Sequence, residues 1–285
     1  MDEFPHGIAM AWSFPPLPAI LILVAALLYL RGWRKLRSTR AQEIPRWRAL
    51  SFLLGLLSLW IALASPIDAL DDFLLSAHMF QHFILMSVAP PLLVLGCPVV
   101  PFLRGLPRGL IRALRPFFSL RFVHKLARAT VHPATAWMAM NIAYLGWHIP
   151  AAFELTLHSE TWHSLEHLCF LFTSIAFWWV ILAPWPSQPH GSRWILVPYL
   201  LTADLVNTVL SAVLAFSGRV LYPSYAEAER VTRLTPLQDQ VLAGSEMWVL
   251  NSLAFLVPAA AIVFILLRPR ILQASHMEIS GLADS

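Results

Sequence analysis

The sequence predicts an all-α polytopic membrane helical bundle, a single transmembrane domain of about seven helices over residues 1–285. The chain is 58% hydrophobic and only 13% charged, whereas ordinary soluble domains carry about 25% charged residues. Its apolar residues also come in blocks of roughly 20, the length that a helix needs to cross about 30 Å of hydrocarbon. A transmembrane barrel would require alternating segments of about ten residues, and the sequence has none.

Seven apolar blocks define the predicted spans. In chain order they cover residues 12–31, 47–66, 74–96, 133–151, 162–183, 194–217 and 241–267. The first block is predicted to be a retained helix, because acidic residues precede it and basic residues follow it, the reverse of a cleavable signal. Residues 271–285 are predicted to form a short disordered cytoplasmic tail, and no second domain is expected.

The distribution of positive charge orients the predicted bundle. Of the 20 lysines and arginines, 17 fall on one side, mostly in the connections 31–48 and 104–128. Because cytoplasmic loops are rich in Lys and Arg, the amino terminus is predicted outside and the carboxyl terminus in the cytoplasm. The basic segment Arg104–Arg128 also contains regularly placed apolar residues, so it is expected to lie on the inner membrane surface against anionic lipid. This loop pattern explains the net positive charge without a nucleic-acid partner.

Histidines gather at the predicted outer face. The third and fifth spans both begin there, with His78-Met79-Phe80-Gln81-His82 and His163-Ser164-Leu165-Glu166-His167. Residues four apart share one face of a helix. The proposed metal ligands are His78, His82, His148, His163 and His167, with His158 and Met247 as additional or transfer ligands. Glu166, Glu246 and Gln81 are predicted to orient these ligands from behind, as outer-shell partners commonly do.

A single histidine at a helix end is usually an ordinary interfacial residue. Two pairs at helical spacing, together with His148, are better explained by metal binding or proton handling. Met79 is interpreted as lipid-facing packing and Cys169 as core packing. Asp204, near the middle of the sixth span, is either a hydrogen-bonding anchor between helices or part of an ion path. Imidazole and thioether ligands on an oxidising side of a membrane favour copper over zinc, although zinc would also accept several imidazoles.

At these motifs the chain resembles the CtaG type of cytochrome c oxidase assembly factor, a bacterial family with seven predicted spans. The resemblance covers about residues 45–268. It rests on His78–His82, Ala89–Pro98, Trp147–Pro150, His158, His163, Glu166-His167, Trp178, Pro184, Leu237–Gln240, Ala243-Gly244 and Met247-Trp248. The resemblance implies a non-enzymatic, chaperone-like role in the bacterial cell membrane. It further implies that copper is handled for a haem–copper oxidase, with cytochrome c oxidase subunits as partners.

Two other functions remain open. Membrane di-iron hydroxylases and desaturases also carry paired histidines, but they add adjacent His-His boxes on the cytoplasmic side, and this sequence has no adjacent His-His pair. Haem handling is the second, although two histidines four apart on one helix face crowd the same side of a porphyrin. A retinal protein is excluded, because the only lysines, Lys35 and Lys125, lie in basic cytoplasmic segments. The oligomeric state does not follow from the sequence.

Overall fold

The computed structural model describes residues 12–40, 42, 44–184, 187 and 192–283, with side chains up to Arg268. Within this part of the chain every regular element is helical, which confirms the all-α prediction. Six of the helices in the described residues are long and apolar enough to cross a membrane. The elements are α1 (Pro16–Arg40), α2 (Arg46–Ala64), α3 (Pro66–Leu70), α4 (Leu75–Phe83), η2 (Ile84–Val88), α5 (Ala89–Leu95), α6 (Val99–Gly105), α7 (Arg108–Phe118), α8 (Arg121–Thr130), α9 (Pro133–Trp147), α10 (Pro150–Leu157), α11 (Glu160–Leu182), η3 (Arg193–Ile195), α12 (Leu196–Phe216), α13 (Pro223–Glu227) and α14 (Pro236–Ala283).

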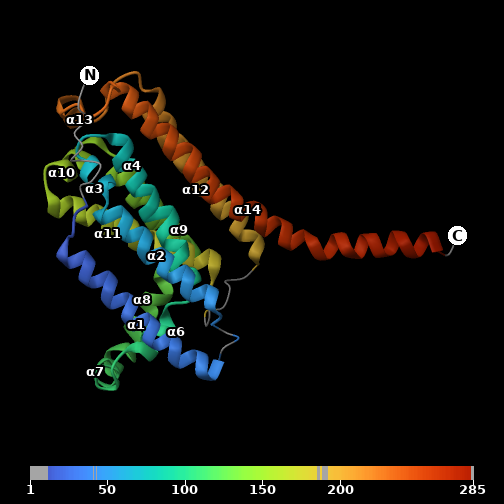
Figure 1. Cartoon of the computed structure of the whole chain (residues 1–285). Helices are drawn as coiled ribbons and strands as arrows, with labels where there is room; N and C mark the ends of the chain where they lie inside the picture. The colour runs from blue at the N-terminus through green and yellow to red at the C-terminus, as the bar shows by residue number, and fades with distance from the viewer. Residues whose placement is uncertain (1–11, 41, 43, 185–186, 188–191, 284–285) are drawn as a thin grey trace.

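The long helices run side by side, and the short ones cap the two ends of the bundle (Figure 1). The short helices α3, α10 and α13 cluster at one end, which we call the histidine end, together with the starts of α4 and α11. The basic helices α7 and α8 lie toward the opposite end. This arrangement separates the basic segments from the histidines, while the orientation of the bundle in a cell stays a prediction.

The third long segment is a composite of α4, the π-helical η2 and α5. Pro90 and Pro91 cause the irregularity, because a proline has no backbone N–H to donate to the carbonyl four residues earlier. The carbonyl of Met86 instead accepts a hydrogen bond of 3.0 Å from the indole Nε1 of Trp178 on α11. A bond from a neighbouring helix thus satisfies a backbone group that would otherwise be unpaired inside the bundle.

Helix α9 is the shortest of the predicted spans. It has 15 residues and ends at Trp147, because Ile149, which precedes Pro150, is extended. Whether α9 crosses the membrane alone stays a prediction, although it packs on α11 and α12 within the bundle. The break places His148 at the C-cap of α9, buried at the histidine end.

The last two long helices, α12 and α14, pack closely along each other (Figure 1). Gly244 permits this approach, because a Cβ at that position would lie 2.8 Å from the backbone nitrogen of Ala215. The predicted basic surface segment contains two exposed amphipathic helices, α7 and α8. The structure describes the tail predicted over 271–285 as the helical end of α14 up to Ala283, without its side chains, and its disorder stays a prediction.

Candidate metal centre

Five histidines meet inside the histidine end, and we call them the histidine cluster: His78, His82, His148, His163 and His167. The imidazole centroids of His78 and His82 are 4.3 Å apart on α4, and those of His163 and His167 are 4.2 Å apart on α11. The two helices face each other here, with 5.1 Å between the rings of His78 and His163. The helical spacing in the sequence therefore places both pairs on facing surfaces.

A carboxylate from a distant part of the chain fixes the start of α4. Asp239, in the first turn of α14, accepts hydrogen bonds from the backbone nitrogens of Leu75 and Ser76 at 2.7 and 3.3 Å. It also accepts one from the Ser76 hydroxyl at 2.6 Å. These bonds satisfy N–H groups that lack partners within the first turn of a helix. The cap holds the first turn of α4, and with it His78, against α14.

Glu166 lies between the two histidines of α4. Its carboxylate oxygens are each 3.7 Å from an Nε2 atom, one of His78 and one of His82. That separation is too long for a hydrogen bond. It is close to the spacing of about 3.4 Å that two ligands at 2.0–2.1 Å adopt around one tetrahedral metal. His78, His82 and Glu166, which we call the deep group, offer ligand atoms that all lie within 4.8 Å of one another.

A second set of potential ligands lies nearer the surface and shares one histidine with the first. Asp71, His78 and His163, the rim group, also offer ligand atoms within 4.8 Å of one another. The Oδ2 of Asp71 is 3.6 Å from the Nε2 of His163. Burial raises the pKa of the Asp71 carboxyl to about 9, and the carboxylates of Asp68 and Asp72 add to this rise. A cation bound beside Asp71 would offset the cost of burying its negative charge.

Many polar atoms of this region have no hydrogen-bond partner. They are Oδ2 of Asp71, both ring nitrogens of His78 and His82, Nε2 of His163 and His167, and both carboxylate oxygens of Glu166. Each buried polar atom left unpaired costs about 1–3 kcal/mol. Native proteins contain few such atoms, so nine in one place indicate a site that is built for a ligand.

His148 shows how one ring is prepared to bind. Its Nδ1 lies 2.7 Å from the carbonyl oxygen of Tyr144, which can only accept, so Nδ1 carries the proton. In the neutral ring, Nε2 then keeps its lone pair. That nitrogen is 3.3 Å from the Sδ of Met79, and the ring of His148 is 6.0 Å from that of His82.

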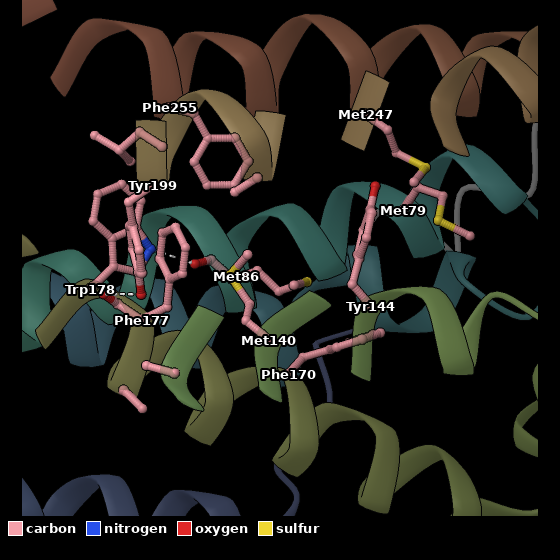
Figure 2. Close-up of a cluster of buried hydrophobic side chains, with 14 of the residues drawn as sticks. Met79, Met86, Met140, Tyr144, Phe170, Phe177, Trp178, Tyr199, Met247 and Phe255 are labelled. Atoms are coloured by element: carbon pink, nitrogen blue, oxygen red, sulfur yellow. Dashed lines mark hydrogen bonds between the residues drawn. The ribbon is translucent and has the colours of Figure 1, made fainter. Parts of the chain in front are cut away.

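Met79, predicted as lipid-facing packing, instead lies inside the bundle beside the histidine cluster. It is 1% exposed, and Figure 2 shows its side chain and that of Met247 pointing toward one another from α4 and α14. Met247 is 3% exposed in the same apolar cluster. The thioether of Met79 therefore lies against the histidine cluster, with that of Met247 beside it.

Three other predicted residues lie apart from the cluster. His158 is exposed at the C-cap of α10, and its Nδ1 is 2.7 Å from the carbonyl oxygen of Glu154. Gln81 turns away from the histidines and donates to the carbonyl of Ala62 at 2.7 Å and to Asp68 at 3.0 Å. Glu246 is half-buried on α14, and no described contact joins it to the cluster. Glu166, predicted to support the ligands from behind, instead lies among them.

Asp204 and the remaining histidines also have defined surroundings. The Oδ1 of Asp204 accepts a 2.7 Å hydrogen bond from the hydroxyl of Ser252 on α14. This bond supports its interpretation as an anchor between helices, and the ion path stays a prediction. His124 and His132 are exposed near α8 and α9.

Comparisons with known proteins relate this chain to a family. A family model described as "Cytochrome c oxidase caa3 assembly factor" matches residues 27–269. Uncharacterized proteins of Mycobacterium bovis and Mycobacterium tuberculosis are each 26% identical to this chain over 263 residues. One of Mycobacterium leprae is 23% identical over the same length. Each alignment covers 88% of this chain and 39% of the relative, so the chain spans about two fifths of their length. No solved structure matches it.

Proposed function

The chain belongs to the cytochrome c oxidase caa3 assembly factor family, and we propose that it binds copper at the histidine end and delivers it to the oxidase. In this proposal the protein is a multi-pass component of the bacterial cell membrane and a chaperone for the metal rather than an enzyme. Its partners are subunits of cytochrome c oxidase. The family supports the assembly role, and the copper chemistry is our inference from the site.

The observation that carries the proposal is the spacing within the deep group. Glu166 faces His78 and His82 at 3.7 Å, with all of these ligand atoms unpaired. This arrangement does not stabilise the fold, since each unpaired polar group in an apolar interior is destabilising. A metal ion between these atoms would satisfy them together.

The donor set favours copper. Imidazole suits zinc and copper alike, whereas a thioether selects the softer ion, and copper(I) is the softest of the common candidates. Met79 supplies a thioether beside His148, and Met247 lies next to it. A cargo ion also has to leave again. Three separate helices, α4, α9 and α11, provide the imidazoles, so small movements between helices would change the coordination without unfolding the chain.

The test replaces one histidine in cells that assemble the oxidase. His82→Ala removes an imidazole of the deep group, and the apolar length of its segment still drives membrane insertion. We expect normal accumulation of the variant in the membrane, with an oxidase that contains haem but has little activity and little copper. Added copper should restore part of the activity by mass action. The measurement is oxidase activity and copper per haem, with and without added copper.

A matched control separates the site from histidine content in general. His132→Ala removes an exposed histidine at the other end of α9 and should leave the oxidase unchanged. Full activity of the His82→Ala strain without added copper would contradict the proposal. Loss of haem with unchanged copper would instead favour haem handling, and a defect that copper cannot relieve would favour an enzyme.

A further inference from the structure

A cavity of about 550 Å³ opens at the histidine end, beside the cluster. Its wall is acidic: Asp68, Asp71, Asp72 and Glu160 line it. Among its described lining residues there is no lysine or arginine, and His163 and His167 are part of the same wall. A cleft lined by one sign of charge concentrates ions of the opposite sign. The cavity is thus suited to cations and leads to two of the histidines.

The innermost carboxylate of this wall differs from the others. Asp71 is only 2% exposed, and its Oδ2 has no hydrogen-bond partner. That oxygen is aimed at His163, whose Nε2 is also unpaired at 3.6 Å. The hydroxyl of Tyr225 donates to the backbone carbonyl of Asp71 at 2.8 Å, which holds the main chain of this residue in place. A held, buried carboxylate whose Oδ2 is unpaired and faces an imidazole indicates a ligand position.

We propose that the acidic cavity is the route by which the metal reaches the cluster, and that the rim group is a first binding site on this route. This inference rests on the proposed function, because it assumes that the deep group holds the metal. The ion would first bind Asp71 and His163, with His78, and then move to His82 and Glu166.

His78 gives this transfer a physical basis, because it belongs to both groups. An ion held by His78 can exchange one ligand at a time. A bond to Glu166 or His82 forms as a bond to Asp71 or His163 breaks, and the oxidation state of the metal does not change. Such a stepwise exchange avoids releasing a bare ion inside a poorly solvated interior, which would be costly. The order from rim to deep group also follows burial, since the His163 side chain is 22% exposed, whereas those of His82 and Glu166 are 4% and 0% exposed.

The test measures metal uptake by the full chain in detergent. Cu⁺ is supplied from a coloured chelator, and the loss of the coloured complex is followed by stopped-flow absorbance. For Asp71→Asn, which keeps the shape but removes the carboxyl group that an arriving ion would deprotonate and bind, we expect uptake at least about 10-fold slower, comparable to the loss that removing one partner of a metal site commonly causes. The deep group is intact, so the final affinity should change much less. Glu229→Gln removes an exposed acid that does not line the cavity and should match the wild type.

A second variant tests the access route even if Asp71→Asn fails to fold. Asp68→Asn with Asp72→Asn keeps the rim ligands but weakens the field of the cavity. Its uptake should be several-fold slower at low salt and approach the wild-type rate at about 1 M salt, where charges are screened beyond about 3 Å. Wild-type uptake rates in both variants would overturn the access route.

The two proposals fail in different ways. If Asp71→Asn takes up Cu⁺ as fast as the wild type while His82→Ala no longer binds it, only the access route is wrong. If His82→Ala binds Cu⁺ as tightly as the wild type, the deep group is not the metal site, and both the proposed function and the access route are contradicted. A slow Asp71→Asn variant together with a non-binding His82→Ala variant would support both.

Discussion

Two groups of buried polar side chains lie within one bundle, and they differ in whether their atoms are paired. In the histidine cluster, both ring nitrogens of His78 and His82 have no partner. Deeper in the bundle, Asn207 accepts hydrogen bonds from the Tyr144 hydroxyl at 2.9 Å and from the Asn251 amide at 3.2 Å. The Ser87 hydroxyl in turn donates to Asn251 at 2.7 Å. We call these four residues, Asn207, Asn251, Ser87 and Tyr144, the asparagine network.

The difference shows what kind of burial points to function. The asparagine network joins α9, η2, α12 and α14, and its members largely satisfy one another, as polar residues between membrane helices are expected to do. Only the Nδ2 atom of Asn207 lacks a partner in it. Buried polar residues that satisfy one another thus hold the helices together and do not by themselves indicate a functional site. Unpaired atoms at ligand spacing are what distinguish the histidine end.

The strongest way to break this comparison is to remove an unpaired group. His78→Leu deletes two unpaired ring nitrogens and a ligand shared by both groups. Loss of an outer-shell partner already costs 10–100-fold in metal affinity, so we expect a fall of at least about 100-fold here. Without metal, the free energy of unfolding should stay the same or rise by about 1 kcal/mol, because an unpaired polar group has been removed.

Both quantities can be measured on purified protein in detergent. Chelator competition gives the affinity for Cu⁺, and thermal or denaturant unfolding of the metal-free protein gives the stability. His132→Leu is the matched control and should change neither, since that histidine is exposed away from the cluster. A clearly destabilised metal-free His78→Leu would mean that His78 has a structural role, and the contrast with the asparagine network would be lost.

A smaller effect should identify the chemical character of the site. Met79→Leu conserves volume and apolar packing but removes the sulfur that lies 3.3 Å from His148. Because thioethers prefer soft ions, we expect Cu⁺ affinity to fall about 10-fold, or about 1.4 kcal/mol, while Zn²⁺ affinity stays within experimental error. The measurement is chelator competition with each metal.

Met140→Leu is the control for this variant, since Met140 is equally buried but lines the cavity beside Asn207 rather than the histidines. Equal losses for Cu⁺ and Zn²⁺ would show that Met79 acts only through packing. That result would remove the sulfur from the argument for copper.

The sequence predicted those parts of the site that depend on spacing within one helix. His78 and His82, and likewise His163 and His167, lie four residues apart, and a helix places such residues on one face. Apolar length alone predicted the helical bundle, because a segment of about 20 apolar residues has few other stable structures. The break after Trp147 could also have been predicted, since Pro150 disfavours a helical conformation in the residue before it.

The parts that the sequence did not predict depend on packing between helices. Met79 meets His148 only because α4 and α9 turn those faces toward each other. Asp71 sits in a short connection whose path no periodicity specifies. Gln81 occupies the same motif position as Glu166 but points to Asp68 instead of the histidines. The side chains at equivalent positions of the two motifs therefore have different partners, because the helices that surround them differ.

The smallest expected effect lies in the asparagine network. Asn207→Ala leaves the Tyr144 hydroxyl and the Asn251 amide without their shared acceptor. It also enlarges a neighbouring cavity of about 20 Å³, which is roughly the space of one water molecule. Hydrogen bonds between membrane helices contribute about 0.6 kcal/mol on average and at most about 1.7. We expect a loss of about 1 kcal/mol in the free energy of unfolding, with Cu⁺ affinity unchanged.

Asn141→Ala provides the matched control, because Asn141 lines the same cavity but donates only to the carbonyl of Trp137 within its own helix, at 2.8 Å. Its loss of stability should be smaller than that of Asn207→Ala, since no bond between helices is lost. Unfolding in detergent would measure the stability of both variants, and chelator competition would measure their Cu⁺ affinity.

Substitutions in the paired asparagine network should lower the free energy of unfolding and leave metal affinity unchanged. Substitutions in the unpaired histidine cluster should lower metal affinity without lowering the free energy of unfolding. If Asn207→Ala lowered Cu⁺ affinity as strongly as Met79→Leu, the two groups would be energetically coupled through Tyr144, whose carbonyl holds the ring of His148. The asparagine network would then be part of the metal site rather than only part of the scaffold.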